Sequence, residues 1–313
     1  MSVDAVVATA GPDLPERMTR VEAALRRAAT WAPGELAGHA LATIAAGGKR
    51  LRPMLVFLAA GRDAPQDDDG LVRAAVAVEL IHSATLVHDD VLDGAALRRG
   101  RPTVVAAAGR DMAIATGDLL FARAFAELAR NGRADEVRSL SDATSALAAG
   151  ELLQREDAWS DDVAAERYLR RCELKTGALF RAACELGALE AARPAEELGE
   201  FGARIGLAFQ LLDDVLDVTG PAERTGKHRG TDLLDGTVTL PLILARERGL
   251  ELDLRAVTTP EQAESACDAI AATGSLADVR ARALGLVAEA KEALPGRDRA
   301  LELVADGVVE RYS

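Results

Sequence analysis

SATLVHDDVLD at Ser83–Asp93 and LAFQLLDDVLD at Leu207–Asp217 end with the same five letters, and each copy closes an apolar helical pattern. On a helix, the first and last aspartates of DDVLD lie four residues apart and point the same way, while the middle one is rotated by about 100° from them. The sequence therefore predicts two helices that each carry a cluster of carboxylates.

Three carboxylates on one turn repel each other by about a few tenths of a kcal/mol per pair, and here they adjoin leucines and valines that favour burial. Hard divalent cations would neutralise them, and Mg²⁺ held by one or two carboxylates completes its shell with water and substrate phosphate. Two solvated acidic helix faces are the alternative. Two identical copies in similar apolar settings favour metal binding.

The composition indicates one all-α domain spanning residues 1–313, with residues 1–18 as a flexible arm. No long Pro/Gly/Ser-rich linker follows about Thr19, aromatic residues make up only 3% of the chain, and alanine and leucine are abundant. Cys172, Cys184 and Cys267 are far apart and odd in number, which is typical of apolar core positions in a reducing compartment.

A net charge of −13 argues against a nucleic-acid partner, because binding phosphates along a duplex requires a basic face. An anionic substrate would need local basic residues. The N-terminus carries Asp4 and no basic segment typical of a signal peptide, and no stretch approaches about 18 uncharged apolar residues. We therefore expect a cytoplasmic protein without an integral membrane segment.

Basic residues recur beside the predicted acidic helices. In GGKRLRP (Gly47–Pro53), the glycines permit a sharp turn, which leaves Lys49 and Arg52 near a helix N-terminus suited to an anion. Arg98 and Arg99 follow the first acidic turn, where a bound diphosphate needs countercharge. In both places, a solvated basic loop is the alternative.

Four other polar residues adjoin apolar helical patterns. His82 lies seven residues before Asp89 on the same helical face, although a hydrogen-bonded core histidine is the alternative. Lys175, Thr176 and a glycine interrupt an apolar face and predict a kink that exposes a phosphate-binding group, unless the lysine extends to solvent. Gln210 joins the face of Asp213.

Helices are predicted over residues 70–93, 111–129, 135–156, 164–189, 197–219 and from about 240, with two or more amphipathic helices beyond.

Taken together, the ordered motifs resemble the trans-isoprenyl diphosphate synthase (polyprenyl synthetase) family. From Leu41 to Leu244 they are GGKRLRP, HSATLVHDDVLD followed by RRGRPT, GELLQ, KTG, and FQLLDDVLD followed by GK and TLP. The resemblance implies an isoprenoid-synthase-type helical bundle, with the acidic helices facing each other around a central cavity. It also implies a homodimer and three Mg²⁺ ions per active site.

The resemblance also implies roles for individual residues. Asp89, Asp93 and Asp213 would bind metal, with Asp90, Asp214 and Asp217 in support. The allylic diphosphate would be held by Arg98, Lys175, Thr176, Gln210 and Lys227, and isopentenyl diphosphate by Lys49, Arg52, His82 and Arg99. The family often has a lysine before TLP where this chain has Thr237, so one cation on the allylic side is missing.

The implied reaction is ionisation of the allylic diphosphate and attack by isopentenyl diphosphate, which lengthens the prenyl chain by five carbons. In the family, a bulky aromatic four or five residues before the first aspartate stops elongation early. Here Ala84 and Thr85 are small, which favours a medium- or long-chain product over farnesyl diphosphate, with geranylgeranyl diphosphate as the alternative. Val78, Ile81, Phe121 and Phe125 are candidate floors of the tunnel.

Two other functions use a similar fold. A class I terpene cyclase binds no second diphosphate, which would leave GGKRLRP and His82 unexplained. A non-catalytic partner subunit would be expected to lose aspartates, and both motifs are intact here.

Overall fold

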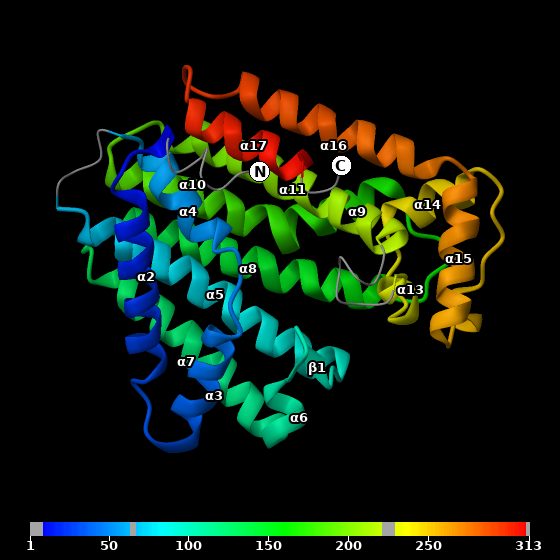
Figure 1. The fold of residues 1–313 in the computed structure, drawn as a ribbon, viewed down its shortest axis with the longest axis horizontal. Coiled ribbons are helices and arrows are strands. Elements are labelled where there is room, and N and C mark those ends of the chain that lie inside the picture. Colours follow the sequence, from blue (N-terminus) through cyan, green and yellow to red (C-terminus); the bar gives the residue numbers. More distant parts are fainter. Residues whose placement is uncertain (1–8, 63–66, 221–228, 311–313) are drawn as a thin grey trace.

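The computed structural model describes residues 9–62, 67–220 and 229–310, and this part of the chain is a bundle of α-helices (Figure 1). The helices of the N-terminal half are α2 (Leu14–Ala29), α3 (Gly34–Ala45), α4 (Leu51–Ala60), α5 (Asp69–Asp93), α6 (Val104–Ala108), α7 (Arg110–Ala129) and α8 (Ala134–Asp157). Those of the C-terminal half are α9 (Ala165–Cys172), α10 (Ala178–Glu190), α11 (Ala195–Thr219), α13 (Thr231–Leu234), α14 (Leu240–Glu247), α15 (Pro260–Ala272), α16 (Ser275–Glu292) and α17 (Arg299–Glu310).

The two acidic helices, α5 and α11, form the inner part of the bundle. Helix α5 packs on α4 and α7, and α11 packs on α10 and α16. Their apolar side chains are almost all buried, including Leu80 and Ile81 on α5 and Ile205 and Leu211 on α11. In Figure 1, α16 and α17 lie along the top of the bundle, α2 runs down its left side, and α3 lies near the bottom. The fold class predicted from the sequence is confirmed.

By length and composition alone, helix α5 could cross a membrane. The expectation that no stretch approaches a membrane span is therefore too strong for this helix. In the fold, 78% of its most apolar 18-residue window is buried by the neighbouring helices. This is the environment of a core helix of the bundle.

The break predicted near Lys175 is present as a π-helical turn, η1 (Glu173–Gly177), which separates α9 from α10. A π-turn adds a residue to the helical repeat and is frequent at functional sites. The chain thus retains a continuous helical path but turns Lys175 and Thr176 away from the regular helix register.

Two short features differ from the sequence-based expectation. Helix α2 begins at Leu14, inside the segment assigned to a flexible arm, while residues 1–8 lie outside the described part. After α5 ends at Gly94 in the left-handed conformation, β1 (Leu97–Arg98) and β2 (Arg101–Pro102) form a small antiparallel hairpin. The hairpin holds Arg98 and Arg99 next to the first acidic turn.

The three cysteines are buried and unpaired, as predicted.

Candidate active site

A cavity of about 1680 Å³ opens between α3, α4, α5, α8, η1, α11 and α17. Most residues singled out from the sequence line it. They are Lys49, Arg52, His82, Thr85, Asp89, Asp90, Arg98, Arg99, Phe121, Lys175, Thr176, Gln210 and Asp213. Lys227 lies outside the described residues. The fold therefore brings part of each acidic turn and most of the predicted basic residues to one open cavity, whereas Asp93, Asp214 and Asp217 do not line it.

The first acidic turn is stabilised by two arginines. Arg98 Nε donates to Asp90 Oδ1 over 2.8 Å, and Arg155 on α8 forms an ion pair with Asp93. Burial raises the pKa of Asp89 to about 6, although the positive charge of Lys175 acts in the opposite direction. A carboxylate whose ionised form is this poorly stabilised by the protein is suited to binding a cation.

The second acidic turn combines an exposed and a buried aspartate. Asp213 lines the cavity, whereas Asp214 is 2% exposed and burial raises its pKa to about 8. Asp214 accepts hydrogen bonds from the Tyr168 hydroxyl and from Gln210 Nε2, the latter over 2.8 Å. The Asp217 side chain accepts from the backbone N–H of Asp232 over 3.3 Å.

A concentration of positive charge lies on the α4 side of the cavity. Burial lowers the pKa of the Arg52 guanidinium to about 10, and its buried Nε has no hydrogen-bond partner among the described residues. Burial and the neighbouring Arg98 lower the pKa of Arg99. Burial and the charges of Arg52 and Arg99 hold the pKa of His82 well below its usual range. Such a group of cations is stabilised by an incoming anion.

Arg50, within the same GGKRLRP motif, has a structural role. It adopts a left-handed backbone conformation with φ of 49°, and its guanidinium contacts Glu22 and Glu79, both at 2.6 Å, and the carbonyl of Ile44. Glu79 is itself buried, so the Arg50–Glu79 pair fixes the loop against α5. The remaining basic residues of the motif line the cavity.

The π-turn contributes Lys175 and Thr176, which bond to residues on two different helices. Lys175 forms an ion pair with Glu151 on α8, and Thr176 Oγ1 donates to Gln210 Oε1 over 2.9 Å. Gly150 allows α8 to lie against this turn, since a Cβ there would meet the Lys175 backbone nitrogen at 2.5 Å. Both π-turn side chains are therefore held in place by neighbouring helices.

Several residues of the site were missed by sequence reasoning. Glu151 was noted in GELLQ without a role, and Arg155 and Tyr168 were not singled out. Arg155 bonds to Glu151 over 3.0 Å as well as to Asp93, so it connects α8 to the first acidic turn. A buried tyrosine or an arginine at a helix end gives no local signal of such contacts.

Among the predicted chain-length residues, Thr85 and Phe121 line the cavity, whereas Ala84 and Ile81 are fully buried and do not belong to its lining. His88 packs against Phe121 with ring centroids 5.5 Å apart and lies directly over Gly117, where a Cβ would be 2.2 Å from its Nε2. Thr85, His88 and Phe121 thus line the cavity close to the first acidic turn.

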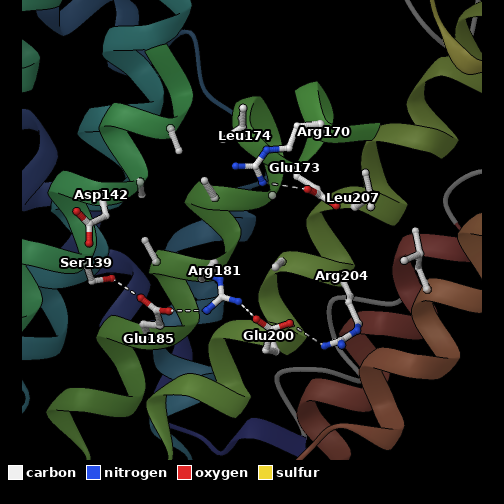
Figure 2. A pocket seen from close by; sticks show the side chains of 17 residues that line it. Ser139, Asp142, Arg170, Glu173, Leu174, Arg181, Glu185, Glu200, Arg204 and Leu207 are labelled. Atoms are coloured by element: carbon white, nitrogen blue, oxygen red, sulfur yellow. Dashed lines mark hydrogen bonds and ion pairs between the residues drawn. The ribbon is translucent and has the colours of Figure 1, made fainter. Parts of the chain in front are cut away.

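A second, smaller hollow of about 670 Å³ lies between α8, α10, α11 and α16 (Figure 2). Most of its charged side chains are paired with one another: Ser139 donates to Glu185 over 2.6 Å, and Arg181 bridges Glu185 and Glu200. Arg204 also contacts Glu200, at 3.1 Å. These paired charges form a surface network, so the larger cavity is the candidate active site.

The donor set of the larger cavity fits Mg²⁺ bound together with a substrate. Among the described residues, no three His, Cys, Asp or Glu side chains form a ready metal-binding cluster. Mg²⁺ usually takes one or two carboxylates and fills its remaining positions with water and substrate phosphate. Asp89 and Asp213, which line the cavity from opposite helices, provide such carboxylates.

Comparisons with known proteins agree with this geometry. Residues 35–272 match the Polyprenyl synthetase family. The chain is 44% identical to heptaprenyl diphosphate synthase component 2 of Geobacillus stearothermophilus over 74% of this chain and 73% of that protein. It is 38% identical to geranylgeranyl diphosphate synthase of Methanosarcina mazei, over 84% of both chains. A crystal structure of a Caulobacter crescentus polyprenyl synthase complexed with calcium and isoprenyl diphosphate is 35% identical, with a TM-score of 0.88 and coverage of 100% of this chain and 98% of that one.

Proposed function

The chain belongs to the polyprenyl synthetase family, and we propose that within it the protein makes a medium- or long-chain all-trans polyprenyl diphosphate. It is a trans-prenyltransferase, and the family uses divalent metals. The observation that supports the proposal best is the single cavity that contains two facing acidic turns and a separate group of cations. Two diphosphates would therefore have distinct places in this cavity.

The allylic diphosphate would lie between the acidic turns. Lys175, Thr176 and Gln210 would hold it from η1 and α11, and Arg98 from the hairpin, with Lys227 as a further candidate beyond the described residues. Isopentenyl diphosphate would bind on the α4 side through Lys49, Arg52, His82 and Arg99. Because His82 stays neutral, it would donate one N–H and leave the positive charge to the arginines.

The reaction requires the allylic C–O bond to break with its electron pair passing to the departing diphosphate. Lys175 and Arg98 stabilise that negative charge, and the double bond of isopentenyl diphosphate then attacks the allylic carbon. The new cation loses a proton to the departed diphosphate, which restores the double bond. Bound Mg²⁺, held by Asp89, Asp93 and Asp213 with three ions in all, would supply further positive charge to the leaving group.

The chain's apolar residues keep water from the reacting centre, as a carbocation requires. Leu147 and Ala148 on α8, Leu179 and Phe180 on α10, and Val304 and Val308 on α17 line the cavity. The growing chain would extend along this surface.

The length of the product depends on the wall below the first acidic turn. Thr85 lines the cavity there with a small side chain, which leaves room for elongation past Asp89. Phe121 also lines it and is the candidate floor. This arrangement supports a product longer than fifteen carbons.

A C20 product is the second candidate, and the similarity to the Methanosarcina mazei geranylgeranyl diphosphate synthase favours it. The purified chain would be incubated with Mg²⁺, labelled isopentenyl diphosphate and each of three allylic primers, and the extracted lipids measured by mass. Products beyond C20 would support the proposal. A single C20 product would overturn the proposed chain length, and no elongation would overturn the proposed substrates.

We also propose that the protein is a homodimer. Large apolar side chains are exposed on neighbouring helices, including Ile114 on α7, and Leu152 on α8 and Leu92 at the end of α5, which also line the cavity. The Geobacillus stearothermophilus relative is called a component of its enzyme, so a second kind of subunit is the alternative. Light scattering of the purified chain, with turnover measured in parallel, distinguishes a homodimer from a chain that needs a second kind of subunit. A monomer that is inactive alone would contradict the homodimer.

A further inference from the structure

Three hydrogen bonds join α9 to the π-turn through the second acidic turn. The Tyr168 hydroxyl donates to Asp214 Oδ2, and Gln210 Nε2 donates to Asp214 Oδ1 over 2.8 Å. Thr176 Oγ1 then donates to Gln210 Oε1 over 2.9 Å. We call these four residues the Tyr168 relay. Only its far end, Gln210 and Thr176, lines the cavity.

The relay sets the orientation of the Gln210 amide. In the structure both Asp214 oxygens accept, Oδ2 from the Tyr168 hydroxyl and Oδ1 from Gln210 Nε2, so the amide presents its NH₂ group to Asp214 and its oxygen to Thr176. One of the two N–H groups of Gln210 is used by Asp214, which leaves the other for a ligand in the cavity. A flipped amide would instead place its oxygen against both the carboxylate and the bound anion.

The Tyr168 side chain is packed tightly enough to fix the orientation of the Gln210 amide through Asp214. Its side chain is 1% exposed, and the guanidinium of Arg171 lies 5.0 Å from its ring centroid. Arg171 is buried as well and donates to the Val238 carbonyl over 2.7 Å, which ties α9 to the segment before α14. Because Tyr168 does not line the cavity, it acts only through Asp214.

We propose that Tyr168 is a positioning residue for the allylic diphosphate: its hydroxyl holds Asp214, which in turn holds Gln210 with an N–H available to the substrate. The inference rests on the proposed function, since it assumes that Gln210 contacts this diphosphate. Removing the hydroxyl leaves Asp214 with one donor fewer and lets the Gln210 side chain change its conformation.

The test is Tyr168→Phe, which keeps the ring and its packing. The matched control is Ser139→Ala, which removes another hydroxyl that donates to a carboxylate, Glu185, outside the cavity. Tyr168→Phe is expected to raise KM for the allylic diphosphate about tenfold, the order expected for one hydrogen bond to a charged group, and to leave KM for isopentenyl diphosphate within about twofold. Ser139→Ala is expected to change neither constant.

Calorimetric binding of the allylic diphosphate with Ca²⁺ replacing Mg²⁺ gives a readout that does not depend on turnover. A double-mutant cycle with Gln210→Ala adds a second one, because the effect of Tyr168→Phe should disappear once Gln210 is absent. If the phenylalanine variant is unstable at the assay temperature, binding is measured 15 °C below its Tm.

Equal binding by wild type and Tyr168→Phe would overturn the inference, as would additive effects in the cycle or an equal rise in both KM values. If the wild-type protein itself does not bind an allylic diphosphate, the proposed function fails instead.

Discussion

Gly150→Ala should separate catalysis from stability, because the added methyl group meets the π-turn that carries Lys175. The new Cβ would lie 2.5 Å from the Lys175 backbone nitrogen and 2.9 Å from its Cα. Ordinary contacts of this kind are about 3.5 Å, so α8 and η1 must move apart by about 1 Å. That displacement falls on the Lys175 backbone and on the neighbouring Glu151, its ion-pair partner.

The expected effect on stability is modest. Overpacking costs about 1–3 kcal/mol, and replacing a helical glycine by alanine returns about 0.5–1 kcal/mol. Catalysis should suffer more, because a displacement of about 1 Å in a group that positions the substrate can reduce the rate on the order of 10²-fold. We expect kcat/KM for the allylic substrate to fall by about that factor.

The assay is steady-state incorporation of labelled isopentenyl diphosphate, with Tm measured in parallel. Gly285→Ala on α16 is the matched control, because a Cβ there meets nothing within 4 Å. It should retain activity and gain stability by about 0.5–1 kcal/mol. Wild-type kcat/KM in Gly150→Ala would refute the view that close contact between α8 and the π-turn positions Lys175.

Four further variants test three other parts of the structure. Thr85→Phe should shorten the product, measured by lipid mass, because Thr85 lines the cavity. Ala84→Phe should mainly lower Tm, because Ala84 is fully buried outside the cavity lining. A shortened product only from Ala84→Phe would contradict the assignment of Thr85 to the wall that limits elongation. Thr237→Lys should lower KM for the allylic diphosphate by restoring a cation, and an unchanged KM would place this residue outside the binding site. Burial and the nearby Glu190 raise the pKa of Glu136, so the folded chain retains a proton that the unfolded chain releases. The free energy of unfolding should therefore fall as pH rises from about 4.3 towards the folded pKa. Glu136→Gln should flatten this pH dependence, measured by urea titrations.

The sequence was sufficient to predict the two acidic helices and a group of charged and polar residues that line the cavity. The repeated DDVLD letters mark two helix ends, and the weak helical signal at Lys175, Thr176 and Gly177 corresponds to the π-turn. These features depend on spacing within one segment, which a sequence displays directly. The basic residues of GGKRLRP were also assigned to an anion site, and Lys49 and Arg52 line the cavity.

Contacts between distant segments could not be predicted. Tyr168 and Asp214 are 46 residues apart, and Arg155 and Asp93 are 62 apart. Each of these residues looks ordinary within its own helix, because the partner lies on another element. Ala84 remains a predicted chain-length residue: it lies five residues before Asp89 and is fully buried, while its neighbour Thr85 lines the cavity.

The internal partners of the acidic turns explain how a chain with a net charge of −13 retains two carboxylate clusters in an apolar bundle. Arg98 neutralises Asp90, Arg155 neutralises Asp93, and the Tyr168 hydroxyl and Gln210 solvate Asp214. Asp89 has no such hydrogen bond or ion pair within the described part of the chain, and burial raises its pKa to about 6. The protein thus supplies internal partners for Asp90, Asp93 and Asp214, and at Asp89 it leaves a carboxylate for a cation and its diphosphate to balance.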